Sequence, residues 1–131
     1  MTTSSKWCYL KALHGRHYLK IIFFDCETNS LDTERGFIQE IAWAVFDVES
    51  RRLLKSRSFI LRWNMTYTVD PGAFAATELS REFCEENGQP VSIALLAFIG
   101  DIKECQIVCG HNIIDFDILI LQSNVKRACF S

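Results

Sequence analysis

IIFFDCET, residues 21–28, decides the fold of this chain, and its counterpart near the C-terminus is GHNIIDFD, residues 110–117. In each stretch, carboxylates follow a short continuous apolar run, which is typical of a strand buried inside a sheet. The first run, residues 21–24, predicts a central strand covered on both faces. Carboxylates that a fold gathers at the ends of buried strands need compensating positive charge, and divalent cations commonly supply it. The two stretches therefore indicate metal-dependent chemistry on phosphates.

Hydrophobic periodicity predicts the other elements. Alternating apolar and polar side chains indicate strands, and apolar side chains at helical spacing indicate helices. The expected strands are 21–24, 37–48, 53–63 and 105–109, and the expected helices lie within 77–86, at 91–102 and from about Asp115 onward. The resulting order, β-β-β-α-β-α, predicts an α/β fold in which a meander is followed by a helix that crosses to a parallel strand.

The composition fits one folded domain. The chain has 131 residues, of which 49% are hydrophobic and 23% charged, and its formal net charge is −2. That charge argues against a broad basic surface for nucleic acid, although an enzyme that holds a chain end through metal ions needs few basic side chains. Residues 1–19 contain no acid and are expected to form an N-terminal extension, with a transit peptide as the alternative, beside a domain spanning 20–131.

The six cysteines form no C-x-x-C pairs, so neither a zinc site nor a disulfide framework is expected. They are expected to be reduced, in a cytoplasmic protein. No apolar stretch reaches the length of a transmembrane segment, so no membrane association is expected.

Both acidic stretches resemble motifs of a known family. Asp25-x-Glu27-Thr28 is similar to the first motif of the DEDD-type 3′–5′ exonucleases, and Asn112, three residues, then Phe116-Asp117 is similar to their second motif. That family includes the epsilon subunit of DNA polymerase III, ribonuclease T and oligoribonuclease. The resemblance covers the chain from about residue 20 to the C-terminus. It implies a ribonuclease-H-like fold and hydrolysis of phosphodiester bonds at the 3′ ends of single-stranded DNA or RNA.

The resemblance also implies which residues act. Asp25, Glu27 and Asp117 would be the catalytic residues and the ligands of two Mg²⁺ or Mn²⁺ ions, with Asp25 bridging both. Asp25 and Glu27 are two apart on an extended segment, so their side chains leave the same face of the strand. The predicted contacts with the substrate are Thr28, Asn29, Leu31 and Asn112.

Each of these residues also has a purely structural interpretation. Asp25 and Glu27 could be acids at a solvated strand end, and Asp117 could complement the dipole of the final helix. Asp115 is the better candidate for that capping role, which leaves Asp117 to face the site. The other expectations assign no catalytic role: support for Glu40, packing or hydrogen bonding for His111, and the core for Cys26, Trp43 and Trp63.

The family's third motif, with a His or Tyr and a last metal-binding Asp, has no counterpart here, because residues 118–131 contain no acid, His or Tyr. The resemblance therefore implies that the C-terminal part of the fold is missing and that the chain alone is weakly active or inactive. A second copy or a partner chain could cover the missing part. The alternatives are an inactive nucleic-acid-binding or interaction module on the same fold, and another ribonuclease-H-like enzyme such as a transposase. The choice between DNA and RNA and between His- and Tyr-type subgroups stays open.

Overall fold

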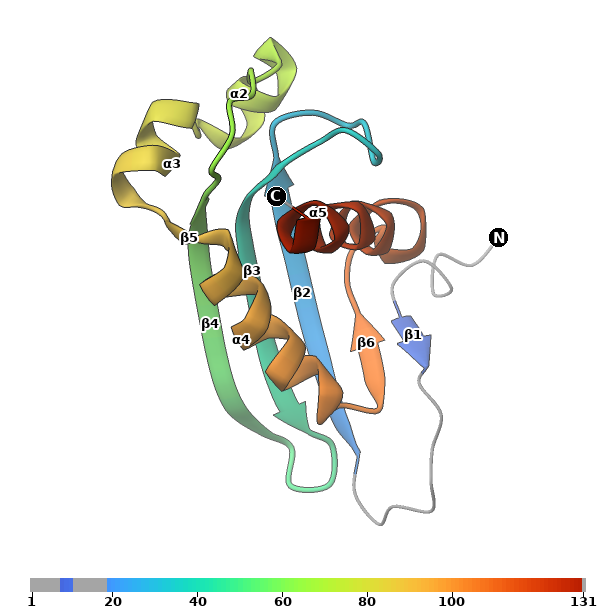
Figure 1. Ribbon diagram of the computed structural model, residues 1–131. Coiled ribbons are helices and arrows are strands. Elements are labelled where there is room, and N and C mark those ends of the chain that lie inside the picture. Colours follow the sequence, from blue (N-terminus) through green and yellow to red (C-terminus); the bar gives the residue numbers. More distant parts are fainter. Residues whose placement is uncertain (1–7, 11–18, 131) are drawn as a thin grey trace.

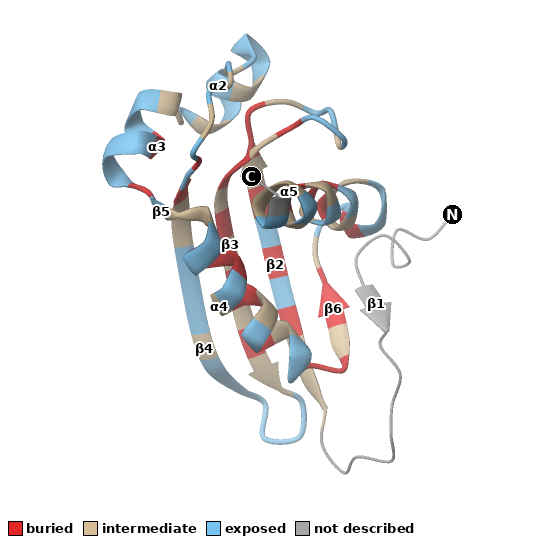
Figure 2. Cartoon of the chain, viewed as in Figure 1, coloured by how far each residue is buried: buried red, intermediate tan, exposed pale blue. Residues whose placement is uncertain are grey.

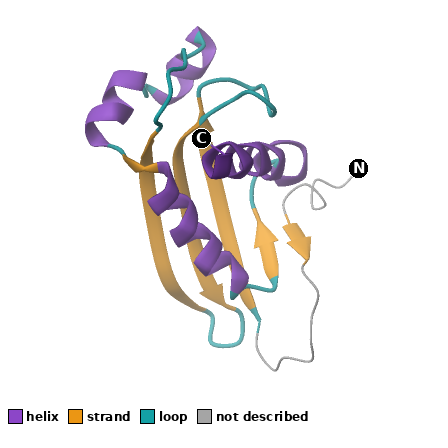
Figure 3. Cartoon of the chain, viewed as in Figure 1, coloured by secondary structure: helices purple, strands orange, loops and turns teal. Residues whose placement is uncertain are grey.

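The computed structural model describes residues 8–10 and 19–130, and these build a six-stranded mixed sheet with helices on one face (Figure 1). The strands are β1 (Cys8–Leu10), β2 (Lys20–Thr28), β3 (Ile38–Asp47), β4 (Arg52–Arg62), β5 (Gln89–Pro90) and β6 (Ile107–Cys109). The helices are α2 (Pro71–Thr77), α3 (Arg81–Asn87), α4 (Val91–Lys103), the π-helical turn η1 (Ile113–Asp117) and α5 (Ile118–Phe130). Figure 3 separates helices from strands.

The sheet has the strand order β1-β6-β2-β3-β4-β5. β2, β3 and β4 form the predicted antiparallel meander, and α4 crosses from β4 to β6, which lies parallel to β2. The register pairs Phe23 of β2 with Cys109 of β6. Because the two strands run in the same direction, the two acidic stretches emerge from the same end of the sheet.

α4 and α5 both lie over one face of the sheet (Figure 2). On that face Ile22, Phe24 and Cys26 of β2 are buried, whereas Phe23 and Asp25, which point the other way, are exposed. The expectation that this strand is covered on both faces is therefore wrong. A continuous apolar run indicates burial of the strand, but within the described residues only one side of it is covered.

The core lies between this face and the helices. Phe98 of α4 packs on Phe24 and Trp43, with ring centroids 5.0 and 5.2 Å away. Trp43 and Trp63 are both buried, as expected, and the Trp63 indole donates to the carbonyl of Ile38 (2.8 Å).

The structure adds elements that the sequence pattern did not predict. α2 begins at Pro71, before the expected helix, and β1 lies within the expected N-terminal extension and pairs antiparallel with β6. The remaining part of that extension, apart from residue 19, lies outside the described residues. In the part of the chain that the structure describes, no helix is long and apolar enough to span a bilayer.

One prediction about the cysteines is also wrong. Cys109, at the end of β6, is disulfide-bonded, whereas Cys26, Cys84, Cys105 and Cys129 are free. No paired spacing around Cys109 indicated this bond, because sheet pairing, and not local spacing, decides which residues lie beside this cysteine.

Candidate active site

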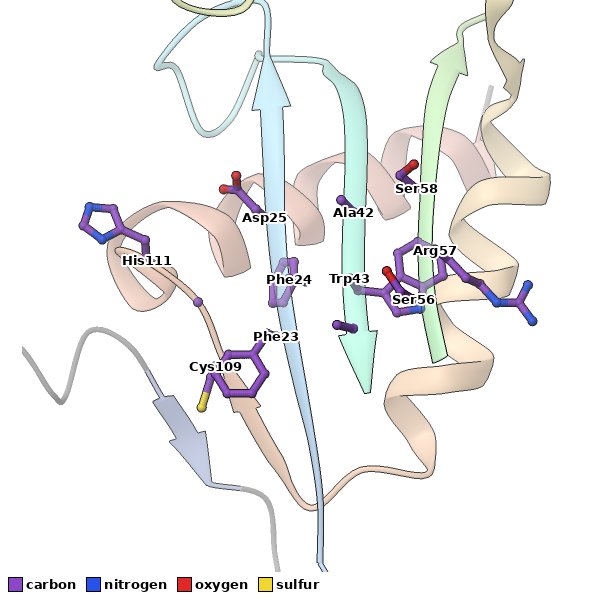
Figure 4. Close-up of a pocket in the computed structure, with 12 residues that line it drawn as sticks. Phe23, Phe24, Asp25, Ala42, Trp43, Ser56, Arg57, Ser58, Cys109 and His111 are labelled. Atoms are coloured by element: carbon purple, nitrogen blue, oxygen red, sulfur yellow. The ribbon is translucent and has the colours of Figure 1, made fainter. Parts of the chain in front are cut away.

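Two of the three predicted catalytic acids lie at the C-terminal end of β2. Asp25 is exposed on the uncovered face of the sheet, and Glu27, on the same face, is half-buried. Figure 4 shows the Asp25 carboxylate pointing away from the strand, at the level where β6 continues into the segment of His111. The alternation of a strand thus places both acids on one face, as the sequence predicted.

The third acid, Asp117, reaches the same strand from η1. Its side chain is only 3% exposed, and its carboxylate accepts a hydrogen bond from the backbone N–H of Cys26, the residue between Asp25 and Glu27. Burial, then the negative charge of Asp25 and, less, that of Glu27 raise the pKa of Asp117 to about 7, against the opposing effect of the Cys26 hydrogen bond. The three acids therefore form one electrostatic unit, which we call the acid cluster.

Two further pKa shifts, of Glu27 and of the Cys26 thiol, indicate the same concentration of negative charge. Partial burial, then Asp25 and Glu40 raise the pKa of Glu27. Burial, then Asp117, Asp25 and Glu27 raise the pKa of the Cys26 thiol well above its usual range. Within residues 19–130, however, no three His, Cys, Asp or Glu side chains stand in the arrangement of a formed metal site.

A cavity of about 650 Å³ opens beside the acid cluster. Glu27, Thr28 and Leu31 line it from β2 and the following loop, which we call the β2–β3 loop (residues 29–37). Phe116 lines it from η1, and Ala73, Ala76 and Thr77 line it from α2. It brings two of the four predicted substrate-contacting residues together with one of the acids.

The four residues that were predicted to contact the substrate differ in their exposure and in the hydrogen bonds that they already make. Leu31 is 85% exposed, whereas Thr28 is buried and donates its hydroxyl to the carbonyl of Ser30 (2.7 Å). Asn29 is buried, and its amide accepts from the N–H of Phe37 (2.6 Å) and donates to the carbonyl of Thr68 (2.8 Å). Asn29 thus braces the β2–β3 loop and is not among the residues that line the cavity.

Asn112, the fourth predicted contact, is exposed and directly precedes η1. Its φ of 55° lies in the left-handed region, which Asn tolerates better than most residues, and its carbonyl accepts from the N–H of Phe116 (3.0 Å). Asp115 is exposed in the first turn of η1 and Asp117 faces β2, so Asp117 is the acid that turns toward the site.

α2 forms one wall of this cavity, which the sequence pattern did not predict. The missed signal is local: Asp70 precedes Pro71, and Pro at the first helical position is a common helix start. Phe116, the aromatic residue of the second motif, is half-buried: it packs against the core and also lines the cavity.

A second, shallow cavity of about 840 Å³ lies on the uncovered face of the sheet (Figure 4). Asp25 lines it together with His111, Phe23 and Ala44. Asp25 and Glu27 therefore border different hollows, and the acid cluster lies between them.

No protein-family model matches the sequence, and no curated protein matches it. Solved structures of exonuclease I share its fold. A product-bound exonuclease I has a TM-score of 0.74 at 18% identity, covering 84% of this chain and 26% of that chain. Exonuclease I from Methylocaldum szegediense gives 0.75 at 18% identity, covering 84% of this chain and 24% of that chain. E. coli exonuclease I in complex with a dT13 oligonucleotide gives 0.74 at 18% identity, with the same two coverages as the Methylocaldum enzyme.

This similarity establishes the fold. The chain has the α/β, ribonuclease-H-like fold of exonuclease I, as the sequence predicted, and it spans about a quarter of the length of the exonuclease I chains.

Proposed function

We propose that this chain is a 3′–5′ exonuclease domain that acts on the 3′ ends of single-stranded nucleic acid with divalent metal ions. The observation that carries the proposal is the acid cluster: Asp25 and Glu27 of one strand meet Asp117 from a distant part of the sequence beside an open cavity. Burial, then the charges of Asp25 and Glu27, raise the pKa of Asp117. The shared fold with exonuclease I supports the same reading.

The donor set fits Mg²⁺ or Mn²⁺, since these ions prefer carboxylate oxygens and retain several waters. The raised pKa of Asp117 indicates negative charge that a cation would relieve. Asp25 and Glu27 are not fully buried, so their side chains can rotate toward a shared ion. Bound metal ions would supply an activated water and stabilise charge on the phosphate.

Each residue around the acid cluster then has its own role. Asp25, Glu27 and Asp117 would hold the ions, and the Cys26 N–H orients the Asp117 carboxylate. Leu31 and Phe116, on two sides of the cavity, offer apolar contacts to the terminal nucleotide, while Thr28, Asn29 and Asn112 order the backbone around it.

The test is metal-dependent binding. We expect Mn²⁺, measured by calorimetry, to bind the wild type and to raise its affinity for a short fluorescent single-stranded DNA with a free 3′ end. Asp25→Asn and Asp117→Asn should each abolish both effects. Asp115→Asn is the matched control, since this exposed acid lies two residues from Asp117, and it should bind like the wild type.

Two outcomes contradict the proposal. DNA binding that is indifferent to Mn²⁺ and to Asp25→Asn would identify a nucleic-acid-binding module without the enzyme's metal site. Absence of both Mn²⁺ and DNA binding by the folded wild type would refute the exonuclease assignment.

A further inference from the structure

Side chains of α5 form hydrogen bonds with the backbone of the β2–β3 loop. Ser123 donates its hydroxyl to the carbonyl of Thr33 (2.7 Å). Asn124 donates to the carbonyl of Gly36 (2.9 Å) and accepts from the N–H of Ile38 (2.9 Å). The Asn124 side chain is fully buried, and a buried amide is stable only when it is hydrogen-bonded in this way.

Arg127, one turn further along α5, holds the same loop. Its guanidinium donates to the carbonyls of Gly36 (2.8 Å) and Glu34 (3.2 Å). It also lies 4.0 Å from the centre of the Phe37 ring, which in turn stacks on Tyr67 at 4.8 Å. We call Ser123, Asn124 and Arg127 the α5 clamp.

The helix that carries the α5 clamp also follows directly on Asp117. Asn124 is seven residues beyond Asp117, which is close to two helical turns, so both residues lie along the same side of the helix. At one end Asp117 is bonded to the N–H of Cys26 in β2, and two turns later Asn124 is bonded to the loop that leaves β2. η1 and α5, which follow one another without a break, therefore connect the acid cluster to the β2–β3 loop.

Hydrogen bonds within the β2–β3 loop also order it, so the α5 clamp binds a loop of defined conformation. Asp32 accepts from the N–H groups of Glu34 (2.9 Å) and Arg35 (3.0 Å), and its carbonyl accepts from the N–H of Gly36 (2.7 Å). Leu31, at the exposed side of this loop, lines the cavity beside Glu27. A shift of the loop would therefore move Leu31 relative to the acids.

We propose that Asn124 and Arg127 are positioning residues for the substrate: they fix the β2–β3 loop relative to the acid cluster, and so set where the terminal nucleotide lies against the metal site. This inference rests on the proposed function. Neither side chain touches the substrate or an ion. Apolar residues would pack α5 on the loop equally well, but they would leave three loop carbonyls, of Thr33, Glu34 and Gly36, without these partners.

The experiment compares Arg127→Ala with Lys126→Ala, the neighbouring exposed cation, so that both variants lose one positive charge from the same turn. In Arg127→Ala we expect the amide hydrogens of the β2–β3 loop to exchange roughly tenfold faster. We also expect affinity for a short fluorescent single-stranded DNA to fall roughly tenfold, with Mn²⁺ affinity within about twofold of the wild type. Lys126→Ala should match the wild type in all three measurements.

The split between DNA and metal affinity separates positioning from general destabilisation, which would weaken both. If Arg127→Ala does not fold, Ser123→Ala, which removes one hydrogen bond to the loop, should show the same pattern with smaller changes. The inference is overturned if loop exchange is unchanged, or if the loop loosens while DNA binding stays at the wild-type level. If the wild type itself binds neither Mn²⁺ nor DNA, the proposed function fails and the positioning role fails with it, whatever the loop exchange shows.

Discussion

Asp117 illustrates the conflict between stability and a candidate active site at the scale of one residue. Its carboxylate is removed from water and lies near two other acids, so its ionised form is unfavourable in the folded chain. The sequence indicated that Asp117 belonged to the site, from its place in the second acidic stretch. Its burial, and its bond to Cys26, depend on contacts across the fold that no local pattern contains.

We predict that Asp117→Asn stabilises the metal-free protein at pH 8. An acid whose folded pKa is raised to about 7 stays protonated while the unfolded chain ionises, so the wild type loses stability as pH rises from about 4 to about 7. The amide removes this loss and can still accept from the Cys26 N–H. The gain should be on the order of 2 kcal/mol after allowance for screening, measured by urea unfolding without divalent ions.

The exposed Asp115→Asn variant serves as the control and should change the free energy of unfolding by less than about 0.5 kcal/mol. Added Mn²⁺ should stabilise the wild type and not Asp117→Asn, because a ligand stabilises only a state that binds it. An Asp117→Asn variant that is less stable than the wild type at pH 8 would show that the acid is compensated within the fold.

Asp101 of α4 is the opposite case, an acid that the fold pairs. It accepts from the Trp43 indole (2.7 Å) and from Lys55 (3.0 Å), and Arg57 lies 3.5 Å away. Burial alone would raise its pKa, but these hydrogen bonds and charges lower it overall. Its partners are between 44 and 58 residues away in the chain, so sequence spacing could not reveal them.

We predict that Asp101→Ala destabilises the protein by about 2–4 kcal/mol at pH 7, because it leaves the buried Trp43 N–H without an acceptor. A lowered folded pKa means that the wild type loses this stability as pH falls through the acidic range, so the difference between wild type and variant should narrow there. Urea unfolding across pH measures both effects. Glu104→Ala is the control, since Glu104 is exposed and its contact with Lys20 is 3.9 Å long. An equal loss of stability in Glu104→Ala would contradict the structural role of Asp101.

At the scale of elements, the sequence predicted those parts whose periodicity is strong. β3, β4 and α4 lie within about two residues of their expected bounds, because each keeps its apolar pattern over many residues. β1 and α2 are short, and their stability comes from neighbours in the fold, so their own residues carry little signal. The π-helical form of η1 was likewise not predicted.

Gly110 fixes how closely η1 follows β6 and β2. A Cβ at this position would lie 2.7 Å from the Phe24 carbonyl and 3.3 Å from the Ile113 side chain, whereas a Cβ at Gly100, on α4, would meet nothing within 4 Å. We predict that Gly110→Ala destabilises the protein by about 2 kcal/mol and weakens Mn²⁺ binding, since η1 must move off β2. Gly100→Ala should instead stabilise it by about 0.5–1 kcal/mol, because Ala favours the helix.

Urea unfolding and Mn²⁺ calorimetry on the two variants test this prediction. A Gly110→Ala protein with wild-type stability and metal affinity would mean that the position of η1 does not depend on this contact.

At the scale of the complete fold, the helices that the structure describes cover one side of the sheet (Figure 1). α4 packs on Phe24 and Trp43 through Phe98. The opposite face presents Phe23 and Ala44 to the shallow cavity beside Asp25. The sequence could not reveal this asymmetry, because the apolar run 21–24 indicates a buried strand whichever element covers it. The open face therefore makes part of the hydrophobic surface of the described chain accessible.

We predict that Phe23 is the main site at which this face binds apolar probes. Phe23 and Phe83 are equally exposed, at 43% and 44%, but Phe23 lies in the apolar cavity next to the Phe46 ring, whereas Phe83 lies on α3 outside that cavity. Phe23→Thr should therefore lower fluorescence of a bound hydrophobic dye by roughly half and reduce concentration-dependent association, while Phe83→Thr should leave both near wild type. Thr suits a strand, so Phe23→Thr should cost no more than about 1–2 kcal/mol, mainly the lost ring contact. Dye fluorescence measures the first effect, and size-exclusion chromatography at matched concentrations measures association. Equal results for the two variants would show that the open face is not the surface that binds apolar probes.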